Sequence, residues 1–337
     1  MTEAPDPRAN PDLVGHDASE RVLAEAMRSG RLHHAWLLLG PAGIGKATLA
    51  FRFARRLLAG PTAGGDLYLD PASTVFRRVA AGSHADLLTV ERAWDDKKQR
   101  LRGEIVVADV RRIADFLHRT PAEGGWRVVV VDGAEDLNRN AANALLKVLE
   151  EPPPRAVLLL ACSAAGRLLP TIRSRCRRLA LTPLQPADLE TALMRLRPDL
   201  DADERSRLAA LSGGSAGRAL ALAGAGGVAL EGAVARLLAD PARLTTGDAL
   251  RTADQLGRDE AAFTGFMELL RERLAATVRE AARGVDDDRT RALAARGLDE
   301  WVAVWHALGT LQGETEGLHL DRREALVQGF RLLSGAA

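Results

Sequence analysis

The 337 residues carry 46 Lys and Arg against 45 Asp and Glu, a formal net charge of +1 that argues against a strongly basic nucleic-acid binder. The length predicts two or three domains, and the 47% share of hydrophobic residues is enough to build sizeable cores. The two cysteines, Cys162 and Cys176, exclude a four-cysteine zinc site and predict reduced thiols in a cytosolic protein.

The amino-terminal segment to Asp12 is rich in Pro, Asp and Ala and lacks the apolar core of a signal peptide. A stretch of about 20 uninterrupted apolar residues is absent from the sequence, so we expect no membrane span. A helix is predicted from residue 17 to about residue 29, where Gly30 ends it. His33 and His34 follow, and without other ligands nearby we interpret them as surface or packing residues rather than a metal site.

The most informative stretch is Gly40-Pro41-Ala42-Gly43-Ile44-Gly45-Lys46-Ala47-Thr48. It follows an apolar strand, residues 36–39, and precedes a helical pattern, residues 49–58, which is the context of a phosphate-binding loop. Backbone N–H groups, the helix dipole and the Lys46 charge all favour phosphate oxygens. The alternative is a glycine-rich turn in a packed core.

One position departs from the phosphate-loop pattern. The residue after the lysine, whose hydroxyl holds Mg²⁺, is Ala47, and Thr48 comes one residue late, about 100° further round a helix. We therefore expect a loop that holds phosphate but is poorly built to hold the metal ion that hydrolysis needs.

Two buried strands follow. Residues 126–132 contain four consecutive valines, which predict a parallel strand covered on both faces, with Asp132 at its carboxyl end. Residues 157–163 are the second, and Ser163 ends it near the expected nucleotide, either as a sensing residue or as an ordinary turn residue. Gly133 follows Asp132, and we expect that Glu135, two residues on, does not substitute for a water-activating glutamate.

Other elements of this half are less distinctive. We expect a strand at residues 84–90, an exposed excursion at 91–103, a helix that Asp109 caps and a helix from residue 141 to 150 that Asn140 caps. Five arginines between Arg167 and Arg178 form the densest basic cluster in the chain. This cluster is a solvated face, a contact for DNA phosphate, or a group that reaches a phosphate held by another subunit.

The rest of the chain is predicted to be helical. A hinge at residues 182–186 precedes three short helices, and an antiparallel helical domain follows in which Trp301 and Trp305 share one helix face. We interpret the two tryptophans as core residues, with an intersubunit contact as the alternative. The helices are expected at 187–196, 201–211, 215–223, 229–238, 247–257, 261–283, 289–308 and 322–333, separated in part by Pro241, the turn at 284–286 and Gly313.

Three segments together resemble the bacterial clamp-loader branch of the AAA+ proteins: the glycine loop, Asn140-Ala141-Ala142-Asn143-Ala144-Leu145-Leu146-Lys147-Val148-Leu149-Glu150-Glu151-Pro152-Pro153, and Ser174-Arg175-Cys176. The resemblance implies an α/β AAA+ fold, with a RecA-like parallel sheet and flanking helices, then a small helical lid and an all-α collar. The corresponding domains are 1–180, 181–227 and 228–337, the last for oligomerisation.

Within that branch the chain is similar to the delta-prime subunits of DNA polymerase III. Motor relatives, the gamma and tau subunits, keep the loop Ser or Thr, a glutamate after the strand aspartate, and a lid arginine. This chain has Ala47, Gly133 and Gly217 there, with Arg218 one residue late. Those motors also carry four zinc cysteines after the loop helix, and residues 68–78 here contain none, so no zinc is predicted.

The resemblance implies a non-hydrolysing stator that helps to load the sliding clamp onto primed DNA during replication. Arg175 is its arginine finger, catalytic in trans at a neighbour's nucleotide, with Ser174 and Cys176 beside it at the interface. The alternative for Arg175 is a structural salt bridge beside a buried cysteine. The remaining degenerate nucleotide-binding set is Gly40, Gly43, Gly45, Lys46, Thr48, Asp132, Ser163 and Arg218.

The implied partners are gamma or tau and delta in a cytoplasmic hetero-pentameric ring, the sliding clamp, and primed DNA through phosphate contacts. ATP or ADP can be bound without hydrolysis, no cofactor is required, and no intrinsic enzyme activity is expected beyond membership of the DNA-directed DNA polymerase III holoenzyme. The alternative is a competent DNA-stimulated ATPase of the gamma or tau type that uses Thr48 and Glu135 as displaced substitutes.

Overall fold

The computed structural model describes residues 5–60, 66–97, 100–123, 125–294 and 296–335. The chain divides into two units with separate cores. The first consists of residues up to 200 together with 213–218, and the second of residues 201–212 together with those from 219 onward. The predicted division at residues 180 and 227 stays a prediction, because this partition assigns the first lid helix to one unit and the second to the other.

The first unit is built on a parallel five-stranded sheet in the order β2-β5-β6-β1-β7. Its strands are β1 (Ala35–Leu39), β2 (Leu87–Val90), β5 (Arg127–Asp132), β6 (Ala156–Cys162) and β7 (Arg177–Ala180). A separate two-stranded ladder pairs β3 (Trp94–Asp95) with β4 (Arg100–Leu101), so the expected exposed excursion contains a small hairpin. The parallel sheet of the predicted fold class is confirmed, and β7, which the sequence did not predict, forms one edge.

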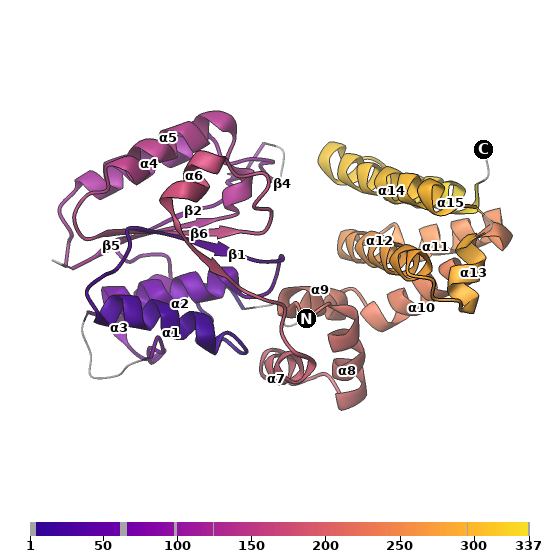
Figure 1. Ribbon diagram of the computed structural model, residues 1–337, viewed down its shortest axis with the longest axis horizontal. Helices are drawn as coiled ribbons and strands as arrows, with labels where there is room; N and C mark the ends of the chain where they lie inside the picture. Colours follow the sequence, from indigo (N-terminus) through magenta and orange to yellow (C-terminus); the bar gives the residue numbers. More distant parts are fainter. Residues whose placement is uncertain (1–4, 61–65, 98–99, 124, 295, 336–337) are drawn as a thin grey trace. The chain divides into compact units, whose positions relative to one another are not determined.

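Helices cover both faces of this sheet (Figure 1). One face carries α1 (Asp17–Arg28), α2 (Lys46–Leu58) and α3 (Thr74–Ala80), and the other carries α4 (Val107–His118), α5 (Arg139–Glu150) and α6 (Pro170–Arg175). The valines of β5 explain the arrangement: Val128 and Val130 belong to the core on the α2 side, whereas Val129 and Val131 belong to the core on the α4 side. Because side chains alternate along a strand, covering both faces requires an apolar residue at every position.

Two helix caps differ from the prediction. The side chain of Asn138, not Asn140, caps α5 by accepting a hydrogen bond from the Ala141 N–H at 2.9 Å. Asp109 lies in the first turn of α4, where its carboxylate accepts the N–H of the cap residue Val106 at 3.0 Å. Helix α5 starts two residues earlier than expected because Asn138 is its cap. Helix α4 starts three residues earlier, because a polar side chain in the first turn can also satisfy a free N–H group.

The second unit is helical. It contains α8 (Ala202–Leu211), most of α9 (Ala216–Gly224), α10 (Gly227–Ala239), η2 (Pro241–Arg243), α11 (Thr246–Leu256), α12 (Glu260–Ala282), α13 (Asp288–Ala294), α14 (Leu298–Leu318) and α15 (Arg322–Ser334). The first unit ends with α7 (Pro186–Leu196) and also holds η1 (Ala134–Asp136). Within the second unit α12 packs against α10 and α14, and α15 packs against α11 and α14.

One of the helices predicted in this unit has the wrong bounds. The segment 289–308 is divided between α13 and α14, because Gly297 adopts a left-handed φ of 81°, and Gly313 lies inside α14 rather than ending a helix. Trp301 is 2% exposed and its Nε1 donates to the Leu293 carbonyl at 2.8 Å, so it is a core residue. Trp305 is half-buried beneath the Arg271 guanidinium, 4.6 Å from the ring centre.

In the described part of the chain no single helix is both long enough and apolar enough to cross a bilayer. Two consecutive helical segments, Ala216–Gly224 and Ala229–Ala239, are long and apolar enough only when taken together, and the chain bends sharply between them.

Candidate functional site

The ends of three neighbouring strands bring together residues that were predicted to bind a nucleotide. Strand β6 lies between β5 and β1, and its Ala161 and Cys162 pair with Asp132 and Leu39, the last residues of those strands. Parallel strands end at the same edge of a sheet, so Asp132, Ser163 and the loop from Gly40 share that edge. This is where open α/β sheets bind their ligands.

Lys46 is folded back onto the loop that precedes it. Its Nζ donates to the carbonyls of Gly40 and Pro41 at 2.8 and 2.6 Å, and the residue is 7% exposed. Burial lowers the pKa of the Lys46 ammonium, while the nearby carboxylates of Glu135 and Asp132 act in the opposite direction. A phosphate group at this loop would replace two neutral carbonyl acceptors with charged oxygens, which bind an ammonium more strongly.

The segment 213–218 is seated directly on the loop. Ser215 Oγ donates to the Ala42 carbonyl at 2.9 Å, and the Gly217 N–H donates to the Gly43 carbonyl at 2.8 Å. A Cβ atom on Gly217 would lie only 2.8 Å from Gly43 Cα, so the two backbones approach as closely as glycine permits. The side of the loop that carries its carbonyls is therefore occupied by the chain itself.

The backbone N–H groups of the loop, unlike its carbonyls, are left free to bind a ligand. His16 Nε2 donates to the Ile44 carbonyl at 2.6 Å, and the Leu49 N–H donates to that of Gly45. Among the described residues, none accepts a hydrogen bond from the N–H groups of Ala42, Gly43, Ile44 or Gly45. Free N–H donors beside a buried lysine at a helix start are suited to an anion, and they support the phosphate-loop interpretation over a simple packed turn.

The groups that would handle a metal ion and water are missing or turned elsewhere. Ala47 has no hydroxyl, and Thr48 is buried in the first turn of α2. Gly133 has a left-handed φ of 77°, and a Cβ atom there would lie 3.0 Å from Asp136 Oδ2, so a glutamate at this position would be strained. Among the described residues, no group of three or more His, Cys, Asp and Glu side chains is placed to hold a metal ion.

Glu135 is engaged at the end of β6. Its Oε1 accepts the Ser163 N–H at 2.9 Å, and its Oε2 is buried. The pKa of the neighbouring Cys162 thiol is raised to about 11, first by burial and then by the Glu135 charge. Burial, then the Glu91 charge, also raises the pKa of Asp132, although Lys46 opposes that shift. The carboxylate of Glu135 therefore holds the backbone amide of Ser163.

Arg175 lies at the end of α6, away from the loop's own residues, and its side chain is 36% exposed. Its guanidinium donates to Glu150 Oε1 at 2.7 Å and to the Thr171 carbonyl at 3.1 Å. Glu150 is the last residue of α5, so the ion pair joins the two most distinctive sequence segments. No local pattern predicts this pair, because its members are far apart along the chain.

The residues beside Arg175 have structural contacts. Ser174 Oγ donates to the Thr171 carbonyl at 3.0 Å. Cys176 is buried, and burial raises the pKa of its thiol to about 12, so it is protonated at neutral pH. Both cysteines are free, as predicted, and both are buried.

The basic cluster from Arg167 to Arg178 does not form one face. Arg167 lies 3.8 Å from Asp136, Arg175 pairs with Glu150, and the Arg177 guanidinium stacks 4.9 Å from the centre of the Trp36 ring. The cluster is therefore distributed over several surfaces of the first unit.

A family model described as DNA polymerase III, delta subunit, matches residues 15–185, just over half of the chain. The chain belongs to this DNA polymerase III family. It is 45% identical over 184 residues to DNA polymerase III subunit delta' of Pseudomonas aeruginosa, covering 54% of this chain and 53% of that protein. It is 33% identical over 180 residues to subunit tau of Escherichia coli, covering 53% of this chain and 26% of tau.

The chain thus spans about half the length of its delta' relative and about a quarter of tau. Among solved structures, a gamma subunit-related protein from Thermotoga maritima has a TM-score of 0.47 at 17% identity, covering 93% of this chain and 98% of that protein. The family match includes the glycine loop, helix α5 and the Ser174–Cys176 triplet, whereas the segment 213–218 lies outside it. His16 and Ser215, which bind loop carbonyls, were not predicted as site residues, because each is a single polar residue without a local pattern.

Proposed function

We propose that this chain is the delta-prime subunit of a DNA polymerase III clamp loader, a cytoplasmic replication complex. It assembles with gamma or tau motor subunits and a delta subunit in a hetero-pentameric ring that loads the sliding clamp onto primed DNA. The higher identity to a delta' subunit than to tau supports this choice. The proposal assigns no nucleotidyl transfer to the chain itself, and it requires neither zinc nor another cofactor.

The loop geometry supports binding of ATP or ADP without hydrolysis. Free N–H groups at residues 42–45 and the Lys46 ammonium are suited to phosphate oxygens. The hydroxyl after the lysine and the glutamate after Asp132 are absent, and loss of one stabilising contact to a transition state commonly costs about 100-fold in rate. Two such losses compound, although not additively, so turnover by this chain is negligible.

The observation that carries the proposal is the guanidinium of Arg175. It is partly exposed at the end of α6 and is held in place by one carboxylate oxygen and one carbonyl. Guanidinium N–H groups that face solvent remain available for a phosphate of another molecule. In a neighbour's site such a group would stabilise the charge that develops on the departing γ-phosphate.

The test is the ATPase activity of a clamp loader reconstituted with Arg175→Ala in this chain. We expect the complex to assemble while the ATP turnover of the motor subunits falls, by up to ~10³-fold if this arginine serves the rate-limiting site. Assembly is measured by size-exclusion chromatography, and turnover by phosphate release with sliding clamp and primed DNA present.

Arg178→Ala is the matched control, because Arg178 is an exposed arginine three residues further along the same segment. It should leave turnover unchanged. Unchanged turnover in the Arg175→Ala complex, with assembly intact, would contradict the proposed role.

A further inference from the structure

A groove on the first unit has no part in the site described above. It is a cavity of about 450 Å³ between α1 and the edge strand β7, lined in part by Arg21, Val22, Arg31 and Arg177. In the register of the sheet, Arg177 lies opposite Trp36 at the start of β1, whereas the glycine loop follows Leu39 at the end of β1. At ~3.3 Å per residue, about 10 Å of strand separates the two levels of the sheet.

The arginines of this groove are electrically uncompensated. Among the described residues, no carboxylate forms an ion pair with Arg21, Arg31 or Arg177. The one acidic residue in the lining, Glu25, is already paired with Arg28 at 2.6 Å. In a chain of net charge +1, three free guanidinium groups around one hollow are a local positive site for an anionic partner.

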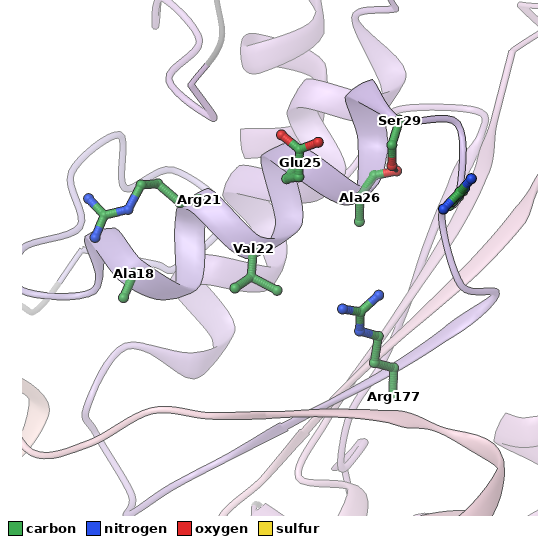
Figure 2. Close-up of a pocket in the computed structure, with 8 residues that line it drawn as sticks. Ala18, Arg21, Val22, Glu25, Ala26, Ser29 and Arg177 are labelled. Carbon is green, nitrogen blue, oxygen red and sulfur yellow. Dashed lines mark hydrogen bonds between the residues drawn. The ribbon is translucent and has the colours of Figure 1, made fainter.

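The walls of the groove differ in character. Figure 2 shows Val22 pointing into the hollow and Arg177 reaching toward α1 from β7, with Arg21 toward one end of the helix wall. Val22 is 38% exposed, and Ala18 and Ala26 lie one turn before and after it. The Arg177 guanidinium stacks on the fully buried Trp36 ring, which limits its side-chain freedom.

The spread of charge indicates a chain of anions rather than a single one. Arg21 and Arg31 lie ten residues apart, and the helix between Arg21 and Arg28 alone rises roughly 10 Å. One phosphate group is too small to contact both ends of the groove. Successive phosphates of a nucleic-acid strand have the required extent, and guanidinium groups bind phosphate oxygens in a bidentate manner.

We propose that the groove between α1 and β7 binds the phosphodiester backbone of a single DNA strand, without reading its sequence. The choice of DNA over another polyanion rests on the proposed function in replication. The lining contains no aromatic ring for base stacking, within the described residues, so the contacts are to phosphates and are sensitive to salt.

The experiment is fluorescence anisotropy of a labelled oligothymidylate titrated with the full chain over a series of salt concentrations. We expect the double variant Arg21→Gln/Arg31→Gln to weaken binding and to flatten the dependence of log K on log salt by about 1.4, since each lost contact on a single strand contributes about 0.7. Val22→Glu, which places a negative charge in the hollow, should weaken binding as well.

The matched control is Arg111→Gln/Arg112→Gln, which removes the same charge from exposed positions on α4, on the opposite face of the sheet. An equal loss in this control, an unchanged salt slope in the groove variant, or no binding by the unmodified chain at low salt would each overturn the inference. So would equal competition by oligoglutamate or by inorganic triphosphate, since either would mean that the groove does not select a phosphate strand.

Thermal unfolding of each variant establishes that it is folded. Because DNA binding is measured on this chain alone, its failure is distinguishable from failure of the Arg175 assay. The latter measures turnover in the assembled complex and requires no contact at the groove.

Discussion

The ion pair between Arg175 and Glu150 decides how the proposed arginine finger is presented. Its side chains are 36% and 48% exposed, and pairs this accessible to solvent contribute at most about 1 kcal/mol. A carboxylate this weakly coupled can orient the guanidinium without preventing it from contacting a phosphate. At the scale of single residues, we therefore expect Glu150 to position the proposed arginine finger, a role that the sequence alone did not reveal.

Glu150→Gln tests that role. The amide keeps the size of the side chain but loses the charge that holds the guanidinium, so we expect the motor subunits' kcat for ATP to fall roughly fivefold, which corresponds to ~1 kcal/mol. Their KM for ATP should be unchanged, since Glu150 does not contact the nucleotide in this proposal. Steady-state kinetics of the reconstituted complex measures both constants.

Glu151→Gln is the control, because Glu151 is the adjacent exposed acid and has no role in holding Arg175. A fall in kcat of the same size in both variants would mean that overall charge, not positioning, is responsible. An increase in kcat for Glu150→Gln would instead show that the ion pair restrains the finger.

At the scale of elements, the first turn of α9 is fixed to the glycine loop by hydrogen bonds and by close packing. Ser215 and Gly217 bind two successive loop carbonyls, and Gly217 has backbone atoms of Gly43 where a side chain would begin. The position where motor relatives are expected to carry a lid arginine is here a point of backbone contact. The contact leaves the loop N–H groups free, so it orders the loop without filling its anion-binding side.

Gly217→Ala should disrupt this contact. The added methyl would lie 2.8 Å from Gly43 Cα, and overpacking of this kind typically costs ~1–3 kcal/mol. We expect a lower Tm and weaker binding of a fluorescent ADP analogue, because the loop loses its support. Differential scanning fluorimetry and fluorescence titration are the measurements.

Gly224→Ala in the same helix is the comparison, because nothing lies within 4 Å of a Cβ atom at that position. Alanine has the higher helix propensity, so its Tm should be equal or higher. If Gly217→Ala is as stable as Gly224→Ala and binds ADP equally well, the contact does not support the loop.

At the scale of the whole molecule, the proposed anion-binding loop is combined with the absence of the side chains that motor relatives are expected to use for hydrolysis. The alternative of a competent ATPase requires Thr48 and Glu135 as substitutes, but Thr48 is buried and Glu135 holds the Ser163 amide. We expect the isolated chain, supplied with Mg²⁺-ATP and primed DNA, to release phosphate no faster than its Lys46→Ala variant. Phosphate release that is clearly above that background and is lost in Lys46→Ala would favour the motor-type alternative.

The sequence by itself determined the parallel sheet and the place of the loop. Both follow from patterns that are local in the chain: the apolar run before Gly40, the four valines before Asp132, and the glycine spacing up to Lys46. Such patterns predict structure because alternation and helix period depend only on neighbouring residues. The cysteine count predicted free thiols, whereas their burial came from the fold. The α5 cap was misplaced because Asn138 and Asn140 are equally suitable as caps by type.

Tertiary structure alone decided which side chains are partners. Four features join residues that are distant in sequence: the pair of Arg175 with Glu150, the contact of Gly217 with the loop, the hydrogen bond from Ser163 to Glu135, and the groove between Arg21 and Arg177. A charge or a glycine has no preferred partner until strands and helices bring one within a few ångströms. The glycine-loop motif could therefore be predicted from the sequence, whereas the contacts around it exist only in the folded structure.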